Sequence, residues 1–265
     1  MNNLIDASST LTLQPSSGVG NGRLEGWVVP RASLTNADRD RMYELLSTYF
    51  DKTERSIFED DLAEKELIIL LREIRSGEIQ GFSTLMRVEI NVDSQDIVAF
   101  FSGDTIVAKE YWGETVLSRL WGQIVFAEAD LIAAERPSTQ VFWFLISSGY
   151  KTYRFLPVFF REFFPCPSLS TPQHIQRILD VLGKTRFGSE YDAASGIVRF
   201  RHAAPLRQGV SDISEQRLND PMVAFFNSKN PGHARGDELA CIARISRANV
   251  TRAGERMLAA QNSLK

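Results

Sequence analysis

The spacing of apolar positions changes several times along the chain, and each change predicts an element. Apolar residues at helical spacing predict one helix over residues 35–51 and a shorter one over 56–65. A short apolar stretch over 27–30 precedes both and predicts a strand. The stripe on the longer helix consists of Met42, Leu45, Leu46, Tyr49 and Phe50.

Three apolar runs follow, over residues 67–74, 79–92 and 97–107, and short turns separate them. The first turn contains Gly77 and the second contains Asp93. Turns this short join antiparallel neighbours, because a parallel crossover needs about a dozen residues or more. The pattern therefore predicts an antiparallel meander of three strands.

After Gly113 the apolar period becomes helical again, and helices and strands then mix to the end of the chain. The first 25 residues lack any such period and are expected to form a disordered tail. This mixture of elements predicts an α+β fold with one main core. The later strands are expected at 140–146, 196–202 and 238–245, and the later helices at 113–132, 150–164, 171–182, 221–227 and 247–262.

Composition narrows the class of protein. A chain of 265 residues that is 43% hydrophobic can bury a sizeable core, and a net charge of −3 lacks the basic excess of a nucleic-acid-binding protein. No stretch approaches the roughly 20 apolar residues of a membrane-spanning helix. No secretory signal is recognisable either. We therefore expect a cytoplasmic protein with neither a nucleic-acid nor a membrane partner. Its three histidines and two cysteines lack ligand spacing, so no metal is expected.

The order of the predicted elements resembles that of the acyl-CoA N-acyltransferase (GNAT) superfamily over nearly the whole chain after residue 26. The resemblance implies a GNAT-like mixed, mostly antiparallel sheet flanked by helices. It also implies a single domain over 26–265, after a tail over 1–25, with insertions at about 166–195 and 203–237. In this family the substrates meet where two neighbouring strands splay apart.

The family's signature turn lies where the last strand of the meander meets the next helix. There a Gln/Arg-x-x-Gly-x-Gly/Ala motif offers backbone N–H groups to the pyrophosphate of a thioester carrier, at a helix N-terminus. Tyr111-Trp112-Gly113 is similar to the Tyr-Arg-Gly that often precedes the family's glycines, but Trp112 stands where Arg is usual. Thr115 and Leu117 replace the glycines themselves.

This turn and its neighbours are the expected donor site. The departures from the motif leave two donors open, an acyl-CoA and a phosphopantetheinyl thioester on an acyl carrier protein. The alternative is that Gly113 makes a plain strand-to-helix turn and Glu114 is a favourable acid in the first turn of the helix. The residues that the resemblance assigns to donor binding are Ile106, Val107, Tyr111, Trp112, Gly113, Glu114, Thr115 and Ser147.

Polar residues interrupt the last strand of the meander at Ser102, Gly103, Asp104 and Thr105. Ser102 and Asp104 are two residues apart, so we expect both on one face of the strand. An acid inside a sheet is costly unless it has a partner or a function. Asp104 is therefore the first candidate for the base that deprotonates an acceptor, with Ser102 beside it. The alternative is a β-bulge at Gly103 in which Asp104 bonds to the backbone.

In the family, a tyrosine on the helix after the next strand protonates the leaving thiolate. The matching segment here, residues 159–164, has phenylalanine at that place. Tyr150 or Tyr153 is expected to replace it, although an aromatic residue on an apolar face is more often part of a core.

These observations predict an acyltransferase that moves an acyl group from a CoA or acyl-carrier-protein thioester to an amine or hydroxyl of a small molecule. The acceptor would attack the thioester directly, without a covalent enzyme intermediate. One alternative is a GNAT-shaped binding or scaffold protein without catalysis, which the altered turn and the missing tyrosine favour. Another is an unrelated α+β enzyme whose element order coincides.

Overall fold

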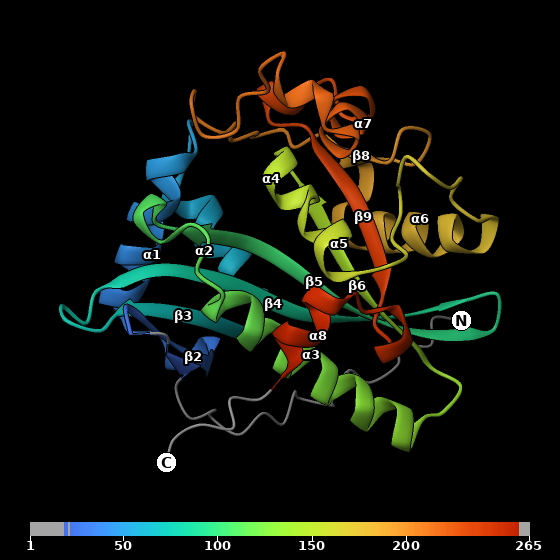
Figure 1. Ribbon diagram of the computed structural model, residues 1–265, viewed down its shortest axis with the longest axis horizontal. Coiled ribbons are helices and arrows are strands. Elements are labelled where there is room, and N and C mark those ends of the chain that lie inside the picture. The colour runs from blue at the N-terminus through green and yellow to red at the C-terminus, as the bar shows by residue number, and fades with distance from the viewer. Residues whose placement is uncertain (1–18, 21, 260–265) are drawn as a thin grey trace.

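A computed structural model describes residues 19–20 and 22–259. Within them, nine strands form one sheet in the order β1-β2-β3-β4-β5-β6-β9-β8-β7 (Figure 1). The strands are β1 (Val19–Gly20), β2 (Leu24–Pro30), β3 (Leu67–Glu73), β4 (Ile79–Val92), β5 (Gln95–Val107), β6 (Gln140–Ser147), β7 (Tyr191–Asp192), β8 (Ile197–Val198) and β9 (Glu238–Arg244).

Neighbouring strands of this sheet are antiparallel, except that β5 and β6 run parallel to each other. Helices cover both faces of the sheet (Figure 1). The predicted α+β fold, with a mixed and mostly antiparallel sheet, is thereby confirmed. The helices are α1 (Asn36–Tyr49), α2 (Arg55–Ala63), α3 (Val116–Glu135), α4 (Tyr150–Tyr153), α5 (Phe155–Phe159), α6 (Gln173–Phe187), α7 (Pro221–Lys229) and α8 (Arg252–Leu258).

Three clusters of buried side chains hold the layers together. The largest joins the sheet to α3, α4, α5, α7 and α8 on one face. A second joins β5, β6 and β9 to α6, and a third joins β3 and β4 to α1 and α2. The side chains of β5 alternate between these clusters, since Phe100 belongs to the first and Phe101 to the second. The strand is therefore buried on both sides along its first half.

Pairing between β5 and β6 stops before either strand ends. Their parallel register runs from Ile97 opposite Gln140 to Ser102 opposite Leu145. Beyond this point β5 remains paired with β4 as far as Val107, and β6 remains paired with β9 as far as Ser147. The two strands thus splay apart in the middle of the sheet, which leaves the inner edge of each strand open.

Several predicted element boundaries differ from the structure. The helix expected over 150–164 is wrong beyond Phe159, because Phe160 and Phe164 instead make β-bridges to Val250 and Ile242. The strand expected over 196–202 is limited to β8, and α8 is shorter than the helix expected over 247–262, whose last residues, 260–262, are not described.

The predicted tail over residues 1–25 lies mostly outside the described residues. Its described end is part of the sheet, because β1 pairs with the start of β2. The division of residues 26–265 into one domain with two insertions stays a prediction. Among the described residues, no helix has both the length and the apolar character required to cross a membrane.

Gly26 allows α3 to pack closely on β2. A methyl group built on Gly26 would lie 2.5 Å from Leu120 Cδ1 and 2.9 Å from Val116 Cγ1, both on α3. Gly26→Ala is expected to lower the free energy of unfolding by about 1–3 kcal/mol, because an overpacked core forces side chains away from their preferred rotamers. Urea denaturation measures this change. The matched control is Gly20→Ala, whose methyl group would meet its nearest neighbours at 3.3 Å, and equal stability of the two variants would contradict the close packing.

Candidate functional site

A β-bulge in β5 lies at the start of the splay. Ser83 and Leu85 are two residues apart on β4, whereas their partners on β5, Thr105 and Ser102, are three residues apart. The extra residue on β5 reverses the alternation of side chains beyond it. Ser102 therefore faces α3, and Asp104 faces the opposite side of the sheet.

The prediction that Ser102 and Asp104 share a face is consequently wrong. It assumed an uninterrupted strand, and the bulge, which the sequence offered as the alternative, is present. Ser102 is buried, and its hydroxyl accepts hydrogen bonds from Trp121 Nε1 and Trp143 Nε1, each at 2.9 Å. This position favours a structural role for Ser102 over a catalytic one.

The bulged half of β5 presents backbone groups to the splay. Ala108 N–H donates to Gln80 O at 2.7 Å, so the backbone groups of alternate residues, Ala108 and Ile106, are directed toward β4. The backbone groups of Thr105 and Val107 are then directed to the open side. Val107 C=O accepts a hydrogen bond there from Trp112 Nε1 at 2.8 Å. An extended ligand with amide groups has matching partners along this edge.

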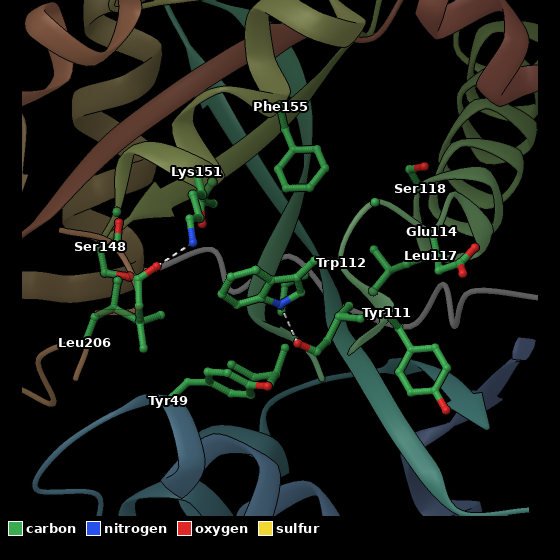
Figure 2. A pocket seen from close by; sticks show the side chains of 18 of the residues that line it. Tyr49, Tyr111, Trp112, Glu114, Leu117, Ser118, Ser148, Lys151, Phe155 and Leu206 are labelled. Carbon is green, nitrogen blue, oxygen red and sulfur yellow. Dashed lines mark hydrogen bonds between the residues drawn. The ribbon is translucent and has the colours of Figure 1, made fainter. Parts of the chain in front are cut away.

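A pocket of about 310 Å³ lies on one side of this edge (Figure 2). We call it the donor pocket, because several residues that the sequence predicts to bind a donor line it. Its walls come from β5, the turn before α3, the start of α4 and α5, and the connection between β8 and α7. Most of its lining is apolar: Leu71, Ile106, Val107, Leu117, Phe155, Leu206 and Val210.

Trp112 lies in the middle of the donor pocket, between two charged side chains (Figure 2). On one side, Lys151 Nζ is 3.9 Å from the centre of the Trp112 ring and also donates to Val210 O. On the other side is Glu114, at the N-terminal end of α3. The indole is 41% exposed, so it forms part of the pocket surface.

The carboxylate of Glu114 lies where the GNAT resemblance expects a pyrophosphate. It accepts a hydrogen bond from Arg23 Nη1 at 3.0 Å. Arg23 also donates to Glu110 O and lies over the Tyr111 ring. A negative side chain at this point satisfies the positive end of the α3 dipole. Glu114 itself precedes the N-cap residue Thr115, and the first turn of α3 contains no acidic residue, so the alternative of a first-turn acid is wrong in its position.

A second pocket, of about 410 Å³, adjoins the first, and we call it the acceptor pocket. Four residues line both pockets: Phe50, Thr105, Ser148 and Thr152. The splay therefore connects two chambers of different character, one mostly apolar and one strongly acidic. The carboxylates among the described lining residues of the acceptor pocket are Glu54, Asp60, Asp61, Glu64, Asp104, Glu190 and Glu238.

Asp104 on β5 and Glu238 on β9 have perturbed protonation equilibria. Burial and, to a smaller extent, the charge of Asp61 raise the pKa of Asp104 to about 7, against the opposing charge of Lys65. Burial, together with the charges of Asp104 and Asp61, raises the pKa of Glu238 to about 8. A carboxylate with a pKa near 7 can both take up and release a proton at neutral pH.

Lys65 lies next to Gly103 at the bulge and stabilises the acidic side chains near Asp104. Its side chain is fully buried, and its ammonium pairs with Asp61 Oδ1 at 2.6 Å. A methyl group on Gly103 would lie 2.7 Å from Lys65 Cε, so the absence of a side chain at Gly103 leaves room for the lysine. Arg186 of α6 also pairs with Asp61, at 2.8 Å, and thereby ties α6 to α2.

The structure gathers most of the predicted donor-binding residues. Six of the eight line the donor pocket: Ile106, Val107, Tyr111, Trp112, Gly113 and Glu114. Thr115 precedes α3 but does not line this pocket. Ser147 is fully buried between β6 and β9, and its neighbour Ser148 lines both pockets instead.

The two tyrosines considered as acids do not line either pocket. Tyr150 is buried in the largest core cluster, and Arg217 lies over its ring. Tyr153 is fully buried, its hydroxyl donates to Pro165 O at 2.8 Å, and burial raises the pKa of its phenol. Lys151 and Thr152, which lie between these two tyrosines in α4, are the residues of this helix that line the pockets.

The sequence analysis missed Asp61, Lys65, Lys151 and Glu238. Lys65 and Glu238 each stand next to or at the start of a buried apolar strand, which is an unusual place for a charge. That signal was available in the sequence. Their convergence with Asp104 depends on the order of strands in the sheet. Within the described residues, no group of three or more His, Cys, Asp or Glu is placed to hold a metal ion.

Comparison with known proteins gives a likeness of fold. No family model and no curated protein matches the chain. Among solved structures, it is similar to a probable N-acyltransferase from Enterococcus faecalis, with 17% identity and a TM-score of 0.36, over 52% of this chain and 33% of that chain. The chain thus spans only a third of that protein.

Two further solved structures are complexes with CoA. One is a GNAT family N-acetyltransferase from Escherichia coli, with 17% identity and a TM-score of 0.33, over 50% of this chain and 67% of that chain. The other is from Mycobacterium tuberculosis, with 10% identity and a TM-score of 0.37, over 83% and 99%. Because these identities and scores are low, the proposals below rest on the pockets and the strands.

Ser102→Ala is expected to lower the free energy of unfolding by about 2–4 kcal/mol, because it leaves two buried indole N–H groups without their acceptor. Thermal and urea denaturation measure the change. The matched control is Ser83→Ala, which removes a single hydrogen bond, to the exposed Thr105 hydroxyl, and is expected to cost about 1 kcal/mol. Wild-type stability of Ser102→Ala would contradict the structural role.

The raised pKa values of Asp104 and Glu238 predict how stability depends on pH. Their pKa values are about 7 and 8 in the folded chain, against 3.8 and 4.5 for the free groups, so folding takes up protons between these limits. The free energy of unfolding therefore falls as the pH rises from about 4 to about 8.

The double variant Asp104→Asn/Glu238→Gln should flatten this dependence. Relative to the wild type it is expected to gain stability at pH 8, whereas at pH 4 the two should be similar. Urea denaturation across the pH range tests this, with the exposed Glu215→Gln as the control. An unchanged slope in the double variant would contradict the burial of these carboxyls.

Proposed function

We propose that this protein transfers an acyl group from a pantetheine thioester to a cationic amine. The observation that carries the proposal is the splay between β5 and β6, where an apolar pocket and an acidic pocket meet at shared residues. The thioester would enter from the donor pocket and the amine from the acceptor pocket. Their reacting atoms would meet near Thr105, Ser148 and Thr152.

The donor pocket fits a pantetheine arm in two respects. Its apolar lining removes a methylene-rich chain from water. The open backbone groups of Thr105 and Val107 supply partners for the amides of that chain, and an N–H group of this edge would also stabilise the oxyanion that forms on the thioester carbonyl. Val107 C=O already accepts one hydrogen bond from Trp112 Nε1, and its second lone pair is the acceptor for an amide of the chain.

The acceptor pocket favours an amine over a neutral alcohol. Its lining contains seven acidic side chains, of which Asp104 and Glu238 are partly protonated at neutral pH, against the basic side chains of Lys52 and Arg186 and the histidine His202. Such an excess of negative charge attracts a protonated amine and concentrates it near the splay. The amine must then lose a proton before it can attack a carbonyl carbon.

Asp104 is the base of the proposed reaction. With a pKa of about 7, its carboxylate accepts the proton of the bound ammonium, and the amine nitrogen then attacks the thioester carbon. The carbon–sulfur bond then breaks, and the nitrogen loses its second proton, which passes to the leaving thiolate to give the free thiol. The hydroxyls of Ser148 and Thr152 stabilise that thiolate as it leaves. The Glu238 side chain interacts electrostatically with Asp104 and with the bound amine. Lys65 pairs with Asp61 and so keeps the acidic side chains near Asp104 in place.

Asp104→Asn is expected to reduce kcat/KM at neutral pH by about 100-fold or more, because an amide cannot accept the proton. The assay is thiol release from acetyl-CoA and longer acyl-CoA thioesters, with primary amines of increasing length as acceptors. Glu215→Gln, which removes an exposed carboxylate outside both pockets, is the control and should remain near the wild-type rate. Loss of the pH dependence near pH 7 should accompany the loss of rate. Wild-type turnover by Asp104→Asn would overturn the assignment of the base.

Two observations support a second candidate, a non-catalytic thioester-binding protein. The Glu114–Arg23 pair occupies the N-terminal end of α3, and the Tyr153 hydroxyl is bonded to Pro165 O within the core. A protein of this kind would bind CoA or a loaded carrier protein and release no thiol with any amine. The same assay, combined with calorimetric titration, therefore separates the two candidates.

A further inference from the structure

The donor pocket has a positive wall opposite the end of α3. Lys151 lines this wall from the start of α4, and Figure 2 shows it on the far side of Trp112 from Glu114. Two more cations lie nearby. The backbone N–H of Lys109, in the turn after β5, donates to the hydroxyl of the pocket residue Tyr49 at 2.7 Å. The guanidinium of Arg217, in the connection between β8 and α7, lies 5.8 Å from the centre of the Tyr150 ring, and Tyr150 precedes Lys151 in the chain. Three separate segments of the chain thus bring positive charge to this side of the pocket.

These three side chains influence one another electrostatically. The pKa of Lys151 is lowered by burial and by repulsion from Arg217 and Lys109, and the nearby Asp212 only partly opposes this effect. Like charges repel each other, and an anion bound between them offsets this repulsion. The Lys151 ammonium bonds to a neutral group, Val210 O, so its charge is available to a bound anion. All three side chains belong to exposed residues and can adjust to such a ligand.

The opposite wall is unfavourable for an anion. The Glu114 carboxylate already lies at the N-terminal end of α3, and its partner Arg23 is directed to Glu114 and to Glu110 O. A phosphate at that point would have to approach a carboxylate of the same sign. The two walls of one pocket therefore differ in charge, and the wall at α4 is the positive one.

We propose that Lys151, together with Lys109 and Arg217, binds the phosphate of a phosphopantetheine thioester at the α4 wall of the donor pocket, in place of the turn before α3. This inference rests on the proposed function, since it concerns the donor of that reaction. It identifies the part of the donor that the protein recognises by charge. That part is common to CoA and to the prosthetic group of an acyl carrier protein.

The test compares two probes that differ by this phosphate alone, 4′-phosphopantetheine and pantetheine, with CoA as a third. Calorimetric titration of the wild type is expected to give the tighter binding for the phosphorylated probe. Lys151→Met keeps the apolar stem over Trp112 and removes the charge. It should weaken binding of 4′-phosphopantetheine and CoA about tenfold and leave pantetheine unchanged, since a charged hydrogen bond to phosphate has about this worth. Lys109→Ala/Arg217→Ala should act in the same direction, and Lys151→Arg should retain binding.

Control variants make the outcome decisive. Lys184→Ala removes an exposed cation from α6 and should change none of the affinities. Glu114→Gln should also change them little. If Glu114→Gln instead tightened the binding of 4′-phosphopantetheine about tenfold, the phosphate would lie at the N-terminal end of α3. That result would overturn the inference.

Two further outcomes separate this inference from the proposed function. If Lys151→Met weakened the binding of 4′-phosphopantetheine and of pantetheine equally, or weakened neither, the phosphate site alone would be overturned. If the wild type bound none of the three probes and no loaded carrier protein, the proposed function would fail, and the inference with it. Titration with holo acyl carrier protein beside CoA distinguishes the two sources of the phosphopantetheine, and the same loss in Lys151→Met is expected for whichever source binds.

Discussion

The end of hydrogen bonding between β5 and β6 is the constraint on which the rest of the site depends. Past Ser102 and Leu145 the two strands have different partners, because β4 retains β5 and β9 retains β6. The bulge in β5 occurs at the same level, so the strand edge opens where its side chains change sides. One irregularity therefore supplies both an edge of unpaired backbone groups for one substrate and a carboxylate, Asp104, for the other. Ser102 fixes this level through the indoles of Trp121 and Trp143.

The two chambers beside the splay owe their different character to different parts of the chain. Leu206, Val210 and Ser211, from the connection between β8 and α7, help to enclose the donor pocket. Phe187 and Glu190, at and just after the end of α6, help to enclose the acceptor pocket. The segments beyond the central sheet and its helices thus complete one wall of each chamber, apolar in one and acidic in the other. The charge of the walls, more than the net charge of −3, decides what each chamber attracts.

Periodicity in the sequence was sufficient to predict the sheet and its main helices, because β3, β4, β5 and α3 are long and strongly patterned. It also pointed to Asp104 and to most of the donor-pocket residues, from a polar break in an apolar strand and from the turn at Gly113. The sequence could not predict which side of the sheet the side chains beyond the bulge face. One extra residue in β5 reverses their alternation, and no residue in the sequence marks where that bulge occurs. Glu238 and Asp61 are far from Asp104 in sequence. The pairing order of the strands brings Glu238 to Asp104, and the packing of α2 on the sheet brings Asp61 there. The prediction of one helix over residues 150–164 failed for a related reason. Phe160 and Phe164 make β-bridges to residues that are distant in sequence, so the helix ends before them.

Trp112 has a consequence for how the molecule is observed. Of the four tryptophans in the chain, Trp121 and Trp143 are buried, and both of their N–H groups are held by Ser102. Trp27 is half-buried on β2. Trp112 is the most exposed of the four, and it has a lysine ammonium against its ring and a hydrogen bond to the strand edge. Its emission and its accessibility to an aqueous quencher depend on what fills the donor pocket, whereas those of the two buried indoles report on the core. The chain therefore contains its own fluorescent reporter of the donor pocket, which differs from the two buried indoles in its accessibility to a quencher.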